Sequence, residues 1–342
     1  MNIRISQLML SYIAVFGAKC RVLSLASLFL FLSFSPLSQA ASRSEAGVYP
    51  SANDLLNRLV NAVRSSSYQG RFTYEHSGKL ELLEVSHAII NGVEYERVNR
   101  LNGERQQLVK SGREASCESL GSIVFKGGSL PLPDGFNTQL NKFYQARVLR
   151  SERIAGRETW VLELRPKDQH RHIQVISIDK DGGLPLRVLV VSLKGAVLER
   201  LHFVSLDLDK QFSLADFKTD ATVNRLDGNN GCQATIVEAQ SPWRPAWIPA
   251  GFMLSHYHYS EIDGHMETYT DGVASFSIFV SPSAATKDGQ ALASSVFAVK
   301  RGATIIVSSS LNSDVAINVT VLGELPRSAL SKILSSVRPQ RS

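Results

Sequence analysis

The sequence of 342 residues has few of the residue patterns from which catalytic and metal sites are usually built. It contains only three cysteines, which are too few for a zinc set of thiolates. It has no Gly-x-Ser-x-Gly nucleophile elbow, no His-Glu-x-x-His metal helix and no Gly-Lys-Ser/Thr phosphate loop. We therefore expect a protein that is not an enzyme, with no catalytic residue, no bound metal and no cofactor.

The first 40 residues have the layout of a secretory signal peptide. They contain three basic residues and no acidic one, then an apolar run over Val22–Phe34, then the small residues of Ser38–Ala40. An uncleaved anchor is the alternative, but the apolar run is shorter than the roughly 20 residues that span a bilayer. We expect cleavage after Ala40 or Ala41 and a periplasmic protein. Cys20 would leave with the signal peptide.

The charge of the exported chain is nearly balanced. The whole chain carries a net charge of +6, and removal of Arg4, Lys19 and Arg21 with the signal peptide halves that excess. This balance does not support a nucleic-acid partner. The two remaining cysteines, Cys117 and Cys232, form an even pair in a compartment that permits disulfides. Whether they are bridged stays open, because the sequence does not show how close they lie.

The exported chain begins with a helix and continues with strands. Ser51 followed by Asp54 is typical of a helix N-cap, and an apolar stripe of leucines and valines then predicts a helix over 51–66. From Tyr68 onward apolar residues occupy every second position, which predicts a strand with one face exposed to solvent. Frequent turn dipeptides, such as Ser77-Gly78 and Asn91-Gly92, predict successive hairpins in one large antiparallel sheet, and a short helix is expected beyond Gly127–Pro133.

A second β-rich region follows an irregular segment. Residues 219–245 are polar and rich in turn residues, so we assign them to a linker between residues 47–218 and a smaller domain over 246–340. Five strands are expected in that domain, with Asp271-Gly272 as one of its turns, and a closing amphipathic helix begins at Pro326. The predicted fold class is α+β with mostly antiparallel β structure.

Three groups of residues attract attention as sites. His170-Arg171-His172 and His256-Tyr257-His258 each place two imidazoles on one side of a predicted strand, but neither pair has a third ligand at metal-binding spacing. Five cations within sixteen residues are either a solvated strand face or a basic rim for acidic groups such as lipid phosphates; they are Lys142, Arg147, Arg150, Arg153 and Arg157. Aromatic strand faces form either ordinary core or a concave surface that accepts acyl chains.

The order of several segments resembles one known family. These segments are Leu55–Leu59, Ser67–Tyr74, Trp247–Phe252 and Tyr269–Val280. Together they are similar to the RseB/MucB family, and the resemblance covers essentially the whole exported chain. It implies a large N-terminal domain similar to the lipoprotein carriers LolA and LppX, an unclosed β-barrel with helices in its mouth. A smaller C-terminal α/β domain follows in that family.

The resemblance also implies a function. The family binds the periplasmic segment of an anti-sigma factor of the RseA/MucA type and shields it from the site-1 protease. Binding of lipopolysaccharide or lipid then releases the segment, and the envelope-stress sigma factor is freed. Such a protein lies at the inner membrane through its partner, and whether it forms a homo-oligomer is left open. A periplasmic lipid or lipoprotein carrier is the alternative function.

The resemblance directs attention to two sets of site residues. For a lipid we expect aromatic residues on the concave face with arginines at a rim, namely Phe72, Tyr74, Trp160, Arg147, Arg150 and Arg153. For the anti-sigma segment we expect residues of the smaller domain, namely Tyr257, Tyr259, Asp271 and Phe276. A bridge between Cys117 and Cys232 would tie the linker to the large domain.

Overall fold

A computed structural model describes residues 49–111, 136–218, 224–225, 241–261, 264–282, 297–312 and 316–340. The expected signal peptide, both cysteines of the exported chain, the loop over Gly127–Pro133 and most of the expected linker lie outside these ranges. Residues 48 to 342 form one unit, and every contact given below lies within it.

Ten strands form one large sheet with the strand order β10-β4-β3-β2-β1-β9-β8-β7-β6-β5. All neighbouring pairs are antiparallel except β10 and β4. Because β10 and β5 lie at opposite ends of this order, the sheet is not closed into a barrel. The strands are β1 Tyr68–His76, β2 Lys79–Ile90, β3 Val93–Arg100, β4 Gln106–Ser111, β5 Tyr144–Ile154, β6 Arg157–Pro166, β7 Ile173–Asp179, β8 Pro185–Val191, β9 Val197–Asp207 and β10 Asn224–Arg225.

The turn residues account for the hairpins of this sheet. Ser77-Gly78 joins β1 to β2, and its two residues have φ angles of 48° and 74°. Asn91-Gly92 joins β2 to β3 with φ angles of 53° and 78°. Two successive positive φ angles match the right-handed twist of the flanking strands. Both predicted hairpins are therefore confirmed.

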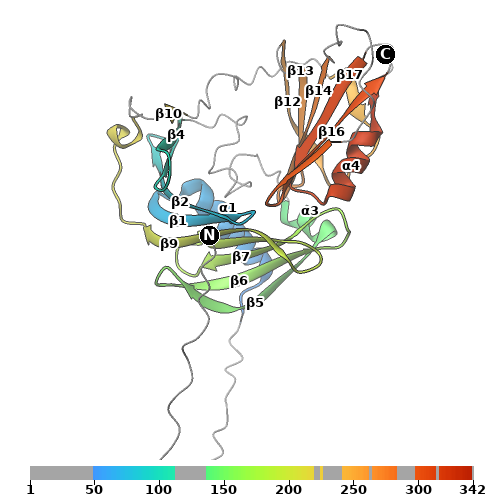
Figure 1. Cartoon of the computed structure of the whole chain (residues 1–342). Coiled ribbons are helices and arrows are strands. Elements are labelled where there is room, and N and C mark those ends of the chain that lie inside the picture. The colour runs from blue at the N-terminus through green and yellow to red at the C-terminus, as the bar shows by residue number, and fades with distance from the viewer. Residues whose placement is uncertain are drawn as a thin grey trace, which may run out of the picture. The chain divides into compact units, whose positions relative to one another are not determined.

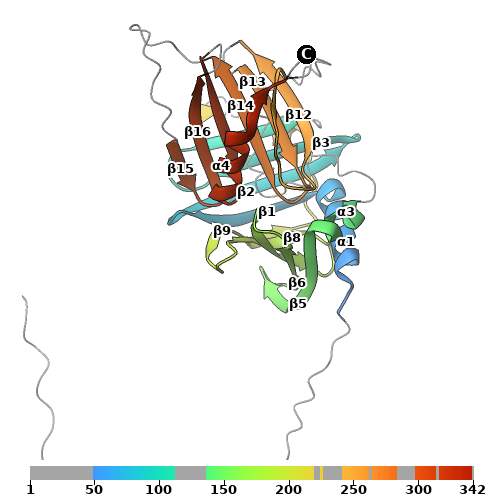
Figure 2. The same cartoon turned by 90° about the vertical axis from the view of Figure 1, so that its right-hand side faces the viewer.

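Two helices pack near each other against the large sheet (Figures 1 and 2). Helix α1 spans Ala52–Ser65, and the Ser51 hydroxyl caps it by accepting a 3.1 Å hydrogen bond from the Asp54 backbone N–H. Helix α3 spans Phe136–Phe143, where the sequence predicts a short helix. Their leucines join residues of β5, β6 and β7 in an apolar cluster, here named the helix cluster: Leu55, Leu56, Leu140, Tyr144, Leu162, Leu164 and Ile178.

The second sheet has six strands in the order β12-β13-β14-β17-β16-β15. They are β12 Met253–Ser260, β13 Gly264–Thr270, β14 Ser275–Pro282, β15 Phe297–Arg301, β16 Thr304–Asn312 and β17 Ala316–Gly323. Five of them are predicted from the sequence, and β17 is not. Two short strands, β11 Trp243–Pro245 and β18 Val337–Pro339, pair beside this sheet, and the 3-10 helix η1 covers Leu214–Phe217.

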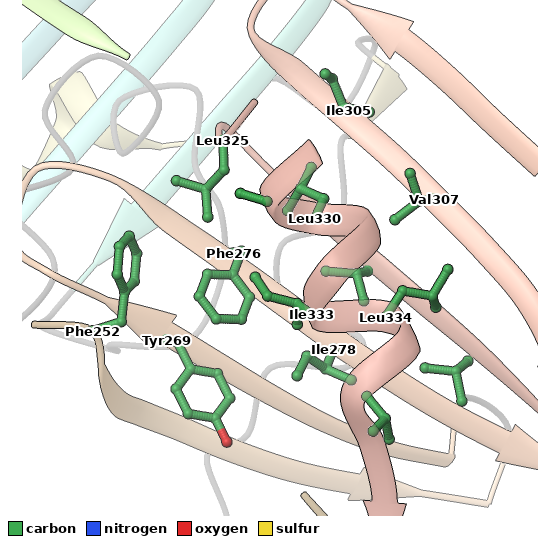
Figure 3. Close-up of a cluster of buried hydrophobic side chains, with 14 of the residues drawn as sticks. Phe252, Tyr269, Phe276, Ile278, Ile305, Val307, Leu325, Leu330, Ile333 and Leu334 are labelled. Atoms are coloured by element: carbon green, nitrogen blue, oxygen red, sulfur yellow. The ribbon is translucent and has the colours of Figure 1, made fainter. Parts of the chain in front are cut away.

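Helix α4, Arg327–Ser336, covers one face of the six-stranded sheet. Figure 3 shows Leu330, Ile333 and Leu334 of this helix directed at side chains of the central strands. The strand residues they meet alternate along β14 and β16, as expected for one face of a sheet; they are Phe276, Ile278, Ile305 and Val307. The expected closing helix is confirmed, with Pro326 as its N-cap residue.

The expected fold class, mostly antiparallel β structure with few helices and unclosed sheets, is confirmed. One local prediction is wrong. His170, Arg171 and His172 lie in the bend between β6 and β7 and not on a strand. No helix among the described residues has the length and hydropathy that crossing a bilayer requires.

Candidate functional site

A fully buried arginine joins the two sheets. The side chain of Arg171, in the bend before β7, has no exposed surface. Its Nε donates a 2.6 Å hydrogen bond to Oδ2 of Asp271, in the turn between β13 and β14. Its two terminal nitrogens donate to the carboxylate of Asp168 and to the carbonyl of Ala250. An arginine is rarely buried unless its charge is paired, so these acceptors explain its position.

Aromatic rings surround the same guanidinium group. The Arg171 Cζ lies 5.2 Å from the ring centre of Phe143, 5.6 Å from that of Tyr144 and 5.0 Å from that of Phe252. These distances fall within the range of cation–π attraction. Burial would lower the pKa of Arg171, but the charge and hydrogen bond of Asp271, together with Tyr144 and Asp168, raise it, so the guanidinium stays charged.

Asp271 is held entirely by donors within the chain. Its Oδ2 accepts from Arg171 and, at 2.8 Å, from the Tyr144 hydroxyl. Its Oδ1 accepts from the backbone N–H groups of Val273 and Ala274 at 2.9 and 2.8 Å. Burial, and secondarily the Asp271 charge, raises the pKa of Tyr144. The turn between β13 and β14 is thus fixed to strand β5 and to the bend before β7.

A second contact lies at the turn between β15 and β16. The backbone N–H of Ala303 donates a 2.8 Å hydrogen bond to Oε1 of Glu199 on β9. The backbone N–H of Gly302 donates a 2.6 Å hydrogen bond to the hydroxyl of Ser77. Arg301 lies 3.5 Å from Glu81, which also pairs with Arg100 at 3.0 Å. Ala303 is fully buried, so this turn is packed as well as hydrogen-bonded.

The residues expected to bind lipid are not brought together. Phe72 is buried in a cluster with Phe203, 5.4 Å between ring centres, and Tyr74 packs against that cluster. Trp160 packs instead against the helix cluster, with the Lys180 Nζ 4.1 Å from its ring centre. The aromatic residues therefore belong to two separate parts of the core.

The arginines expected at a rim are mostly paired with carboxylates. Arg147 bonds Glu163 at 2.7 Å, and Arg150 bonds Glu152 at 3.3 Å. Glu163 lies three residues from Trp160 on β6, so the two side chains point to opposite faces of the sheet. Arg147 therefore lies on the face away from Trp160. Arg153 donates to the carbonyl of Gly156, at a tight turn, and Arg157 is held by Asp179.

Of the residues expected to bind a partner, two lie together on an exposed edge. Tyr257 and Tyr259 are on β12, the outermost strand of the six-stranded sheet. The Tyr257 hydroxyl lies 2.8 Å from His265 Nδ1, and Tyr259 is 51% exposed. Phe276 is in the core under α4, and Asp271 lies in the turn described above. Neither of these two side chains is near the surface.

The histidines give no metal site among the described residues. His256 and His258 lie on one face of β12 with ring centres 6.5 Å apart, as predicted. Burial, and then the neighbouring His258, lowers the pKa of His256. His172 is buried, and burial together with Lys300 lowers its pKa to about 4.

Sequence reasoning missed the two residues on which the contacts between the sheets depend. In the sequence Arg171 stands between two histidines of a candidate metal pair, and Glu199 belongs to no motif. The stretch before β7, residues 167–172, is polar throughout, so the charge of Arg171 alone does not indicate that this residue is buried. Its partner Asp271 is 100 residues away, so spacing along the chain could not reveal the pair.

The fold and these contacts define a mostly antiparallel protein of two unclosed sheets that are joined by buried polar groups. Models of the MucB/RseB N-terminal domain and the MucB/RseB C-terminal domain match residues 51–221 and 237–338. The chain belongs to the MucB/RseB family.

Individual relatives agree with this assignment. The sigma factor AlgU regulatory protein MucB of Pseudomonas aeruginosa is 31% identical over 336 residues, covering 94% of this chain and 98% of the relative. The sigma-E factor regulatory protein RseB of Escherichia coli strain K12 is 24% identical, covering 86% and 93%. The crystal structure of MucB in complex with MucA(peri) matches with a TM-score of 0.66 and 32% identity, covering 85% of this chain and 100% of that one.

Proposed function

We propose that this chain is a periplasmic regulator of an envelope-stress sigma factor that acts by binding rather than by catalysis. Its partner is the periplasmic segment of an anti-sigma factor of the RseA/MucA type. Bound to this protein, the segment is protected from the site-1 protease. Binding of lipopolysaccharide or another lipid releases the segment and permits its cleavage.

The observation that carries this proposal is the match to MucB over both sheets. The similarity covers 85% of this chain and the whole of the MucB chain in its complex with MucA(peri). A lipid carrier would need only a sheet with an apolar face. Here a second sheet is fixed to the first by Arg171 and Glu199, and that arrangement suits a protein in which two binding events are coupled.

The exposed edge strand β12 is the surface that we assign to the partner. Its backbone groups on the outer side face no other strand among those described. Three large apolar side chains are exposed along it: Met253, Leu254 and Tyr259. An extended segment can add to such an edge through main-chain hydrogen bonds, while side-chain contacts give specificity.

The test is a titration of residues 41–342 into the purified periplasmic segment of the anti-sigma factor from the same organism, with and without lipopolysaccharide fragments. We expect binding that the lipid weakens, and slower cleavage of the segment by site-1 protease when this protein is present. No binding in either condition would refute the proposal. Transfer of bound lipid to acceptor vesicles, without any binding of the segment, would identify a lipid carrier instead.

A further inference from the structure

The turn between β13 and β14 presents two different chemical groups to the large sheet. The first is the carboxylate of Asp271, which bonds Arg171 and the Tyr144 hydroxyl. The second is the side chain of Val273, which packs against the helix cluster. An anionic group and an apolar group, two residues apart in the sequence, are thus held side by side, as they are in a lipid with a charged headgroup.

The anion-binding part of this site belongs to the large sheet. Arg171, Tyr144 and Asp168 all come from β5 and from the bend before β7. Only Asp271 comes from the turn. Without it, the buried Arg171 would keep one of its two carboxylate partners, and a phosphate could take the place of the other. A phosphate oxygen in that place would accept charge-assisted hydrogen bonds from Arg171 Nε and from the Tyr144 hydroxyl, as Asp271 Oδ2 does, while Asp168 and the Ala250 carbonyl keep the two terminal nitrogens of Arg171.

The apolar part of the site is covered unequally. Helix α1 contributes Leu55 and Leu56, which are completely or almost completely buried, and α3 contributes the equally buried Leu140. The turn contributes Val273, which is only partly buried. The apolar contact that a ligand must replace at the turn is therefore one partly buried side chain, whereas at α1 it would be two buried leucines.

We propose that Asp271-Gly272-Val273 is a built-in ligand that occupies the binding site of a phosphorylated acyl lipid. The lipid phosphate binds Arg171 and Tyr144, and its acyl chain lies along the helix cluster. Lipid binding and docking of the turn exclude each other. This proposal rests on the proposed function, because it specifies how a lipid would act on the partner: β13 ends at the turn and pairs along its length with β12, the strand assigned to the partner.

Two substitutions that break the same ion pair distinguish this proposal from a purely structural role. Asp271→Asn keeps an oxygen that can cap the turn but removes the charge that competes with the phosphate. Arg171→Met removes the phosphate-binding group itself. With dioctanoyl phosphatidic acid as the probe, we expect Asp271→Asn to bind about tenfold more tightly than the unchanged protein and Arg171→Met about tenfold more weakly.

Three controls accompany this measurement. Arg71→Met breaks an exposed pair with Glu84, between β1 and β2, and should leave lipid affinity unchanged. Dioctanoylglycerol, which lacks the phosphate, should not distinguish Arg171→Met from the unchanged protein. Arg171→Lys, which keeps the charge, replaces Arg171→Met if that variant does not fold, and it should bind the phosphatidic acid more weakly.

Hydrogen exchange provides an independent measurement. Saturation with the phosphatidic acid should accelerate exchange of the Val273 and Ala274 amides, because the turn then loses the contacts with Arg171, Tyr144 and the helix cluster that hold it in place. The proposal is overturned if Asp271→Asn and Arg171→Met change the affinity for phosphatidic acid in the same direction. It is also overturned if the lipid leaves hydrogen exchange at the turn unchanged. These lipid measurements need no anti-sigma segment, so their failure is distinct from failure of the proposed function, which the titration without lipid tests.

Discussion

Glu199 on β9 accepts a 2.8 Å hydrogen bond from the backbone N–H of Ala303, at the tip of the β15–β16 hairpin. Glu199 lies on the same face of β9 as Leu201 and Phe203, which are buried in the core of the large sheet. The Glu199 side chain therefore faces the interior. It lies near Tyr74, whose pKa is raised mainly by burial and secondarily by the charge of Glu199. A buried carboxylate needs donors, and here the small domain's hairpin supplies one.

Gly302→Ala should destabilise this contact. Gly302 has a φ angle of 62°, and a Cβ atom added to it would lie 2.4 Å from Oε1 of Glu199. A residue with a side chain costs about 1–2 kcal/mol in the left-handed region, and the clash adds to that cost. We expect the free energy of unfolding to fall by about 2–4 kcal/mol in urea denaturation.

Gly195→Ala is the matched control. Gly195 also has a positive φ angle, of 86°, but a Cβ atom added there would meet nothing within 4 Å. This variant should therefore show the conformational cost alone, about 1–2 kcal/mol. Equal destabilisation by the two substitutions would mean that the hairpin moves away from Glu199 without cost, and that the contact does not hold the sheets together.

Local sequence chemistry predicted much of the fold because the signals act over a few residues. Ser51 and Asp54 mark the start of α1. The dipeptides Ser77-Gly78 and Asn91-Gly92 mark hairpin turns, because these turns need positive φ angles that glycine and asparagine adopt readily. Strand β17, with the sequence AINVTVLG, is not among the five strands predicted for this sheet. Its alternation of Ile317, Val319 and Val321 is nevertheless that of a strand with one buried face.

The site was much less predictable, for a physical reason. Whether a charged residue is solvated or buried depends on which distant segment folds against it. Arg147 and Arg150 meet carboxylates on the sheet surface, whereas Arg171 meets a carboxylate from the other sheet. Asp271 was chosen as a residue of interest, but its turn signal could not show that it faces an arginine inside the protein.

Acidification should destabilise the fold through His172. Burial, and then the charge of Lys300, lowers its pKa to about 4. Between the unfolded pKa of about 6.5 and this value, the unfolded chain binds a proton that the folded chain does not, so stability falls as the pH falls. From pH 7 to pH 5 we expect a loss of about 2 kcal/mol from this residue.

The measurement is urea denaturation at both pH values for the unchanged protein and for His172→Phe. The substituted protein cannot bind this proton in either state, so its stability should change less between pH 7 and pH 5. An identical loss in both proteins would show that His172 makes no contribution to the acid sensitivity of the fold.

Two aromatic residues of the small domain should respond in opposite ways to truncation. Tyr259 is 51% exposed on β12, so Tyr259→Ala should leave the melting temperature nearly unchanged and weaken binding of the anti-sigma segment by about 10- to 100-fold. Phe276 is 1% exposed beneath α4, so Phe276→Ala should lower the free energy of unfolding by about 3–5 kcal/mol.

Calorimetric titration and thermal melting separate these effects. Tyr257→Phe, which removes only the hydroxyl that meets His265, serves as a conservative change on the same strand. If Tyr259→Ala binds the segment as tightly as the unchanged protein, the partner surface is not the β12 edge.

The contact between Glu199 and the hairpin tip predicts a strong coupling between two substitutions. The three atoms that a Cβ at position 302 would meet most closely all belong to Glu199. Glu199→Ala removes them but leaves the buried N–H of Ala303 without its acceptor, which costs about 1–3 kcal/mol. When Gly302→Ala is then introduced, only its conformational cost remains. The double variant should thus be more stable than the sum of the single effects by about 1–2 kcal/mol. Urea denaturation of the four proteins measures this difference, and strict additivity would show that position 302 and Glu199 do not touch in solution.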